Sequence, residues 1–245
     1  MNDKAEYKVK TFPTSRIGTF DIGVVSNMKH HIKALTELDV TYARRLIKEK
    51  RKQGQKLSFN PWLIKCISSV VEEYPELHGI RKGKNNITIY DDVDISIMIE
   101  REVSGEKVPL PYIIRKTNKK NIEEIQSEIK SAQNQYIDNE GDYVLGEKKK
   151  YLYMRLYYSM PGFIRRAIWR RIICSPLLTK NNLGTVIITS VGMVGRINGW
   201  VIPSSVHPLA FAIGSIIKKA GVVDGNIEVR EYLYMTVAVD HDVVD

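Results

Sequence analysis

The sequence has few of the residues on which several common functional classes depend. It contains only two cysteines among 245 residues, Cys66 and Cys174, too few for a disulfide framework or a four-ligand zinc site. It has no Walker loop and no G-x-G-x-x-G fingerprint, and its five histidines lack metal-ligand spacing. The N-terminus has no apolar signal region, and prolines interrupt the longest stretch without Lys, Arg, Asp or Glu, residues 197–217. We therefore expect a cytoplasmic protein without a metal site.

The charge is distributed unevenly along the chain. The formal net charge is +9, from 37 Lys and Arg against 28 Asp and Glu. Eight of the cations and one acidic residue lie between Glu147 and Arg171, so this segment carries 8 − 1 = +7. Because the rest of the chain is nearly neutral, nucleic-acid binding would depend on this one segment and is not expected.

Apolar spacing predicts strands that come in hairpins, separated by a few long helices. Strands are expected at Phe20–Val25, His31–Val40, Val93–Glu100, Val108–Ile114, Gly184–Ser190, Leu209–Ile216 and Ile227–Asp240. Helices are expected from Thr41 to about Gln53, from Asn60 as far as Pro75, after Asn121, and from Pro161 to Ile173. Asn121 and Glu124 have capping-box spacing. This order favours an α+β layer fold in a single domain, not a doubly wound sheet.

The helix expected from Pro161 to Ile173 is imperfectly amphipathic. At about 100° per residue, one side gathers Ile164, Ala167, Ile168 and Ile172, and the opposite side gathers Arg166 and Arg170. Arg165 and Arg171 fall at the edges of the apolar stripe. We expect the apolar side to pack on the domain and the arginines to face solvent. A weak membrane-surface association through residues 147–173 is the alternative.

His241 is the strongest candidate for a chemical role. The other histidines, His30, His31, His78 and His207, are scattered, and we expect them to be structural or at the surface. His241 ends a strongly patterned strand, and Asp245 follows four residues later. A histidine can act as a base when a nearby carboxylate fixes its orientation, and this pair offers both groups.

Six stretches in chain order carry a family resemblance. They are His31–Thr41 (family pattern ending in E-V-D-V-T), Leu57–Lys65 (L-S-x-N-x-x-I-I-K), Tyr74–His78 (F-P-E-L-N), Asp91–Ser96 (D-x-V-N-I-G), Gly184–Gly192 (G-T-F-T-I-S-x-L-G) and Asp240–Asp245 (D-H-R-x-x-D-G). Over roughly residues 10–137 and 183–245, the chain resembles the catalytic domain of the dihydrolipoyl transacylase component of 2-oxoacid dehydrogenase complexes. The resemblance implies the mixed sheet with packed helices of the chloramphenicol acetyltransferase-like superfamily.

The resemblance also implies roles for individual residues. His241 would be the general base that takes a proton from a thiol, so that the thiolate attacks a thioester carbonyl. Thr189 would donate its hydroxyl to the oxyanion, with Ser190 as the neighbouring alternative, since consecutive strand residues face opposite ways. Asp245 would hold the histidine turn by pairing with an arginine near the N-terminus, for which Arg16 is the best candidate.

The chain departs from the family pattern in three places. We find no lipoyl domain with its lysine turn, so the acyl carrier would be a separate lipoyl-bearing protein. Asp242 replaces the family arginine, and the glycine and helix expected after Asp245 are missing. Residues 138–182 exceed the family connection and contain the basic segment.

The leading interpretation is an acyltransferase that uses coenzyme A or acyl-CoA as substrate and assembles as a homotrimer, with its active-site channel between subunits. One alternative is a catalytically impaired scaffold or binding module of the same fold. Another is transfer to a small alcohol or amine. Asp240, where the alcohol-acylating relative has a second histidine, favours the transacylase branch.

Overall fold

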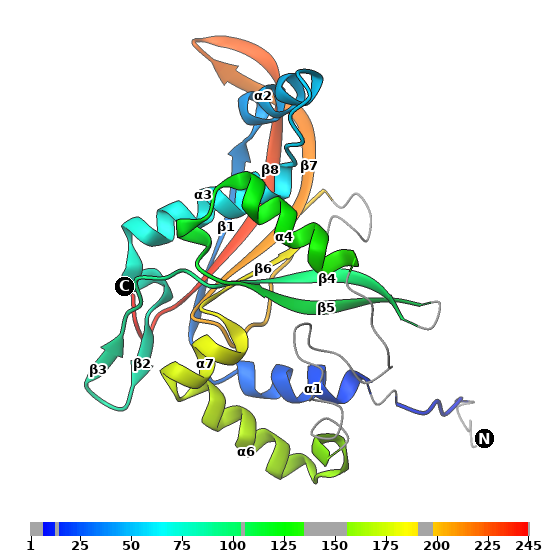
Figure 1. Cartoon of the computed structure of the whole chain (residues 1–245), viewed down its shortest axis with the longest axis vertical. Helices are drawn as coiled ribbons and strands as arrows, with labels where there is room; N and C mark the ends of the chain where they lie inside the picture. The colour runs from blue at the N-terminus through cyan, green and yellow to red at the C-terminus, as the bar shows by residue number, and fades with distance from the viewer. Residues whose placement is uncertain (1–6, 13–14, 104–105, 135–155, 191–197, 245) are drawn as a thin grey trace, which may run out of the picture.

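The computed structural model describes residues 7–12, 15–103, 106–134, 156–190 and 198–244. The helices are α1 (Ser15–Ser26), α2 (Thr41–Lys52), α3 (Phe59–Glu73), α4 (Ile122–Asn134), α6 (Gly162–Ile173) and α7 (Pro176–Leu183), with the 3-10 turns η1 (Pro75–His78) and η2 (Thr117–Lys119). The strands are β1 (His31–Asp39), β2 (Ile80–Lys82), β3 (Asn86–Thr88), β4 (Ile95–Val103), β5 (Glu106–Ile114), β6 (Val186–Ser190), β7 (Leu209–Val223) and β8 (Asn226–Asp240). Figure 1 shows their arrangement.

One mixed sheet organises the molecule. Its strand order is β1-β8-β7-β6-β4-β5, and β2 and β3 form a separate two-stranded sheet. β6 runs parallel to both β4 and β7, whereas the other pairs are antiparallel. The expected α+β fold with a mixed sheet and packed helices is confirmed.

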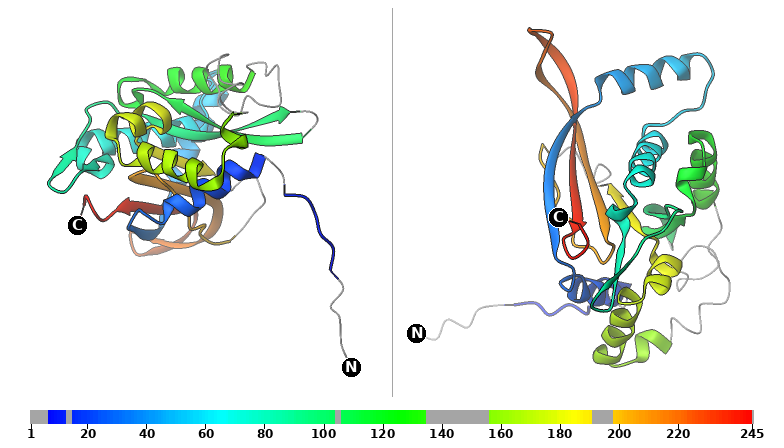
Figure 2. Two further views of the ribbon diagram at one scale, coloured as in Figure 1. Left: turned by 90° about the horizontal axis from the view of Figure 1, so that it is seen from below. Right: turned by 90° about the vertical axis from the view of Figure 1, so that its left-hand side faces the viewer.

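The two faces of this sheet have different coverings. On one face, alternate strand residues such as Ile97, Ile188 and Leu233 form the main core with Leu63 and Ile67 of α3. Figure 2 shows α3 and α4 along this face in its right-hand view. The opposite face carries small buried side chains along β7 and β8, including Ala210, Ala212, Thr236 and Ala238. Because these side chains are small, any segment that covers this face lies close to the backbone of β7 and β8.

The outer halves of β7 and β8 extend beyond the sheet as a two-stranded ribbon, residues 217–231. Figure 1 shows the ribbon and α2 at one end of the molecule, away from α6. Val222, Ile227 and Val229 of the ribbon are exposed, and no residue of α2 is buried. Contiguous exposed apolar residues of this kind mark an interaction surface.

The strand predicted at Phe20–Val25 is wrong, because these residues form most of α1. The β-branched residues of the stretch suggested a strand, but its contacts follow helical spacing. Asp21 and Val25, four residues apart, are both buried. Asp21 Oδ2 accepts hydrogen bonds from Arg165 and Tyr157, so tertiary packing against α6 overrides the local preference.

The helix predicted from Pro161 to Ile173 is confirmed as α6, but its expected orientation is wrong in part. Arg165 points inward to Asp21, whereas Ile164 and Ile168 are exposed. The expectation that arginines face solvent holds for Arg170 and Arg171. A buried carboxylate needs a cationic partner, and this requirement decides which side of α6 faces the protein.

The capping box that starts α4 is confirmed and gives a stability prediction. The Asn121 backbone N–H donates to Glu124 Oε2 at 2.7 Å, and the Glu124 N–H donates to Asn121 Oδ1 at 2.8 Å. We expect Asn121→Ala to lower the free energy of unfolding by about 1 kcal/mol, because a helix-end donor loses its acceptor. Urea denaturation measures the change. Ser127→Ala, an exposed change on the same helix, should alter stability by less than about 0.5 kcal/mol.

Candidate active site

His241 stands in a turn that the end of β8 holds in place. Asp240 is 2% exposed and pairs with Lys29 Nζ at 2.6 Å, with the Lys29 side chain 11% exposed. The His241 N–H donates to the carbonyl of His30 at 3.0 Å, and the Val243 N–H donates to the carbonyl of Asp240 at 3.0 Å. The main chain on both sides of the imidazole is therefore fixed by hydrogen bonds.

The imidazole of His241 has a defined tautomer. Nδ1 lies 3.0 Å from the carbonyl oxygen of Val244. A carbonyl oxygen can only accept, so Nδ1 carries a proton, and in the neutral form of the ring the lone pair is on Nε2. The side chain is exposed at the surface of the single chain. This is the arrangement required of a neutral histidine that accepts a proton through Nε2.

Asp242, which stands where the family pattern has arginine, binds two neighbouring groups. Its Oδ1 lies 2.9 Å from His30 Nδ1, and its Oδ2 accepts from Arg81 Nη1 at 3.4 Å. The hydrogen bond and the charge of Asp242 raise the pKa of His30 above its ordinary value, and His30 in turn lowers the pKa of Asp242. Val243 packs on Gly79, where an added Cβ would approach the Val243 Cγ1 to 3.0 Å. The segment from Gly79 to Arg81 thus supports the His241 turn.

Three further histidines have the structural contacts expected of them. His207 is buried, its Nε2 donates to the Leu183 carbonyl at 3.0 Å, and burial lowers its pKa to about 4. His78 is buried with Nδ1 2.8 Å from Thr185 Oγ1, and burial lowers its pKa. His31 donates from Nε2 to the His207 carbonyl at 2.9 Å, and desolvation lowers its pKa too. Each stays neutral near pH 7.

The two hydroxyl candidates lie on opposite faces of the sheet. Ser190 follows Val186 and Ile188 at alternate positions of β6, and both of these lie in the core beneath α3 and α4. Thr189 therefore faces the other side of the sheet, the side with small residues. Thr189 and Ser190 are both partly buried. A substrate that approaches from the side with the small residues would meet the Thr189 hydroxyl first.

Within one chain, His241 and Thr189 are far apart. Thr189 pairs with Ala212 of β7, and Ala212 pairs with Thr236 of β8. His241 follows Thr236 by five residues, which is about 16 Å along the strand, and two strand spacings add about 10 Å sideways, so their main chains lie about 19 Å apart. The structure does not bring the predicted base and the predicted oxyanion donor together in a single chain.

The predicted support of the His241 turn by Arg16 is not seen in the described part of the chain. Arg16 is exposed in the first turn of α1, and Ser26 ends that helix, about 15 Å along its axis. Lys29, which follows α1, is the residue that reaches the His241 turn. Asp245 lies outside the described residues, so its pairing with Arg16 stays a prediction. Sequence reasoning missed Lys29, His30 and Arg81, whose partners lie 161 to 212 residues away.

Other site types have little support among the described residues. No group of three or more His, Cys, Asp or Glu in those ranges could hold a metal ion. None of the helices that the structure describes is long and apolar enough to span a membrane. An open cavity of about 780 Å³ lies between α2 and the ribbon, lined by Arg44, Asn198, Ile216, Ile217, Lys218 and Glu231. Arg44 is already paired with Glu231 at 3.4 Å, and the cavity gives no basis for assigning a coenzyme A site.

The contact between His30 and Asp242 gives a titration prediction. We expect His30 to titrate above pH 6.5, and we expect Asp242→Asn to return its midpoint to about 6.5, since the cause is the Asp242 carboxylate. Because the pKa of His30 is raised in the folded state, its stabilisation is fully present below pH 6.5. It is lost as the pH rises through the raised pKa.

Histidine ring-proton NMR over a pH series measures this midpoint. Asp224→Asn, the same charge change at the ribbon tip, should leave it unchanged. A midpoint at or below 6.5 in the unaltered chain would show that the contact does not persist in solution.

Comparisons with known proteins agree with this fold. The model of the family described as 2-oxoacid dehydrogenases acyltransferase (catalytic domain) matches residues 24–141. The lipoamide acyltransferase component of the branched-chain alpha-keto acid dehydrogenase complex of Bacillus subtilis is 23% identical, over 99% of this chain and 52% of its own length. The chain spans about half or less of the length of the curated relatives it matches.

Two solved structures show the same fold. A probable dihydrolipoamide acetyltransferase from Listeria monocytogenes superposes with a TM-score of 0.66 at 20% identity, covering 98% of this chain and 88% of that one. The Azotobacter vinelandii dihydrolipoamide acetyltransferase, studied for the roles of a serine, a histidine and an asparagine in catalysis, gives 0.67 at 16% identity and 99% and 88% coverage. Residues 24–141 are therefore similar to the 2-oxoacid dehydrogenases acyltransferase (catalytic domain) family, and the fold of the chain is the one seen in dihydrolipoamide acetyltransferases.

Proposed function

We propose that this chain is an acyltransferase that moves an acyl group between coenzyme A and a thiol such as that of dihydrolipoamide, with His241 as general base. The observation that carries the proposal is the fixed His241 turn, in which the Val244 carbonyl accepts a hydrogen bond from Nδ1. In the neutral imidazole this contact puts the basic lone pair on Nε2. In the Azotobacter relative, the histidine and asparagine studied for catalysis are four residues apart, as are His241 and Asp245 here.

In the proposed reaction, His241 transfers a proton and Thr189 stabilises a negative charge. A thiol with a pKa near 8.5 is mostly protonated at neutral pH, so His241 Nε2 accepts its proton as sulfur attacks the thioester carbonyl. The carbonyl oxygen becomes an oxyanion, and the hydroxyl of Thr189 donates a hydrogen bond to it. Collapse of the tetrahedral intermediate expels the other thiolate, which takes the proton back from the imidazolium.

The site is formed between subunits of a homotrimer. The support for this arrangement is the separation of His241 from Thr189 within one chain, which a second copy removes by supplying one of the two groups. Exposed apolar residues on the edge strand β1 (Ile32, Leu35, Leu38) and on the ribbon offer surfaces for such an assembly. One of the solved structures with this fold is the cubic core of a pyruvate dehydrogenase multienzyme complex.

An assay of thiol release from acetyl-CoA, run across dihydrolipoamide, small alcohols and small amines, tests the reaction. Release with dihydrolipoamide alone supports the proposal. Release only with an alcohol or amine would make the acceptor a different class, and no release with any acceptor would favour a scaffold of the same fold.

His241→Ala is expected to lower the rate of transfer by about 10²–10⁴, because general-base assistance is lost. The side chain is exposed, so the far-ultraviolet circular dichroism and the unfolding midpoint should change little. Steady-state kinetics with acetyl-CoA and dihydrolipoamide measures the loss. Turnover near that of the unaltered chain would remove His241 from the mechanism.

Thr189→Val is expected to lower kcat by about 10²–10³ at nearly constant shape, because the oxyanion loses its donor. Ser190→Ala, the matched control at the next position of β6, should have a mild effect, since Ser190 faces the core. The same assay compares the two variants. A large loss for Ser190→Ala with none for Thr189→Val would reverse the assignment.

Mixing two inactive variants tests the site between subunits. If His241 and Thr189 come from different copies, random mixed trimers of His241→Ala and Thr189→Val chains regain about a quarter of their sites intact. The chains are unfolded together, refolded and assayed against each variant refolded alone. Activity that stays at the level of the separate variants, in mixtures shown to be trimers by light scattering, would place both groups in one chain.

A further inference from the structure

We propose that the outer face of α6 is a docking surface for an anionic membrane, which holds the protein at the lipid surface without a membrane-spanning segment. The inference is independent of the proposed acyl transfer. Three observations support it: the contacts that bury the inner face of α6, the apolar side chains exposed on its outer face, and the positive charge beside them.

The inner face of α6 is fixed by one polar network and a small apolar cluster. Arg165 Nε lies 2.6 Å from Asp21 Oδ2, and Asp21 is fully buried. Tyr157, whose pKa burial raises to about 12, keeps its proton and donates to the same oxygen at 3.0 Å. Trp169 Nε1 donates to the Tyr157 hydroxyl at 2.8 Å. Ile173 packs with Val25 and Val206 behind this network, so the rotation of α6 about its axis is determined.

The outer face of α6 is apolar. Phe163 is 68% exposed, and Ile164 and Ile168 are each 38% exposed. Ala167 lies between them and is also exposed. If the burial of apolar surface alone set the orientation of α6, these residues would face the domain. The hydrogen bonds from Arg165 to Asp21 and from Trp169 to Tyr157 instead hold the opposite side of the helix against the protein. An aromatic and two aliphatic side chains projecting from one short helix match the apolar side of an interfacial helix.

The charge on this face has one sign. Arg170 and Arg171 are exposed on α6 at the edge of this face and within it, and neither forms an ion pair with another residue that the structure describes. Residues 156–184 contain no Asp or Glu, so no acidic side chain of this segment competes for the arginines. Arg171 falls within the apolar stripe, where its long stem can lie along the lipid while the guanidinium reaches the headgroups. Positive charge beside exposed apolar side chains complements an anionic lipid surface.

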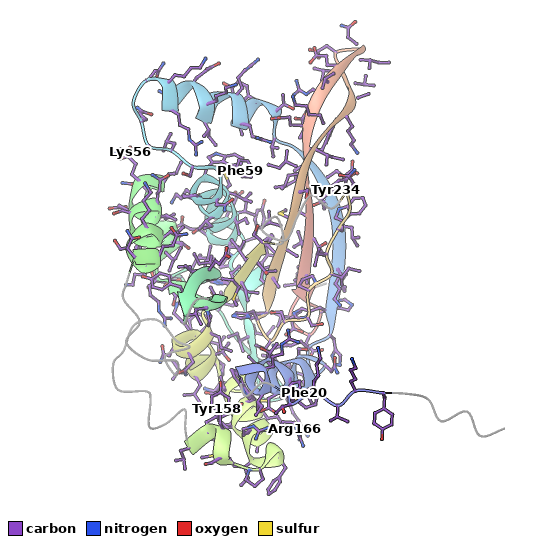
Figure 3. All side chains as sticks on the ribbon, turned by 90° about the vertical axis from the view of Figure 1, so that its right-hand side faces the viewer. Phe20, Lys56, Phe59, Tyr158, Arg166 and Tyr234 are labelled. Atoms are coloured by element: carbon purple, nitrogen blue, oxygen red, sulfur yellow. The ribbon has the colours of Figure 1, made fainter. Side chains whose placement is uncertain are left out.

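The position of α6 allows a flat partner to approach. Figure 1 shows α6 at one end of the molecule, outside α1 and α7 and opposite the end that carries α2 and the ribbon. In Figure 3, Arg166 lies at this end with Tyr158 and Phe20. Phe20 is exposed on α1 and adds a further aromatic side chain near the surface. No described segment extends past α6 and the turn before it in this direction, as Figure 1 and the right-hand view of Figure 2 show.

The test is cosedimentation of the full chain with vesicles of phosphatidylcholine alone and of phosphatidylcholine with phosphatidylserine. We expect binding to the anionic vesicles at about 0.1 M salt, little binding to the neutral ones, and a steep loss at about 1 M salt, where screening shortens to about 3 Å. Each arginine at an anionic surface is worth about fivefold in affinity, so Arg170→Gln with Arg171→Gln should weaken binding about 30-fold. Phe163→Ser should weaken it at least about tenfold.

The matched control is Lys48→Gln with Lys52→Gln, which removes the same charge from exposed positions of α2 at the far end of the molecule. It should leave vesicle binding within about twofold, because these residues lie beyond screening distance of the surface. Equal loss in this control would show attraction by net charge alone and overturn the proposal. Absence of binding to the anionic vesicles would also overturn it. So would a change of mass in light scattering for Phe163→Ser, which would assign the face to contact between copies of the chain.

Discussion

The ion pair between Lys29 and Asp240 is the contact on which the architecture of the site depends. It joins the segment after α1 to the last residue of β8, and both side chains are nearly buried. Removing either charge would leave the other buried without a partner, a cost of several kcal/mol. Because His31 pairs with Asp240 in the antiparallel register of β1 and β8, the same contact fixes the edge strand, the strand next to it and the His241 turn together.

Local patterns predicted those elements whose stabilising contacts are local or periodic. The strand at β8 and the capping box of Asn121 with Glu124 both appear in the structure as expected. The prediction failed for α1, because its decisive contact is between Asp21 and Arg165, 144 residues apart. Neither residue reveals its partner in the sequence, and the exposed side of α6 was assigned wrongly for the same reason. The free-energy cost of leaving a buried carboxylate unpaired is larger than the gain from burying the apolar stripe of a short helix.

The sequence also singles out the residues of the candidate site, but not their arrangement. Family motifs single out His241 and Thr189, and the alternation of β6 distinguishes Thr189 from Ser190 once Val186 and Ile188 are known to lie in the core. The sequence does not reveal how far apart the two residues lie, because that distance depends on strand order. Two intervening pairings and five residues of β8 separate them. The proposed site therefore needs a second copy of the chain to supply either His241 or Thr189.

The proposed assembly of several copies also affects how the exposed face of α6 would bind a membrane. Oligomers with closed symmetry repeat every surface feature, and a threefold rotation keeps the three copies of a helix at one height along its axis. Assembly of the proposed trimer through the ribbon, at the end opposite α6, would leave all three copies of α6 uncovered. Once one helix is bound to a surface, the others bind at high effective concentration, so modest affinity per helix gives stable attachment. In the proposed trimer, a helix of 12 residues that would bind weakly alone is therefore sufficient for attachment.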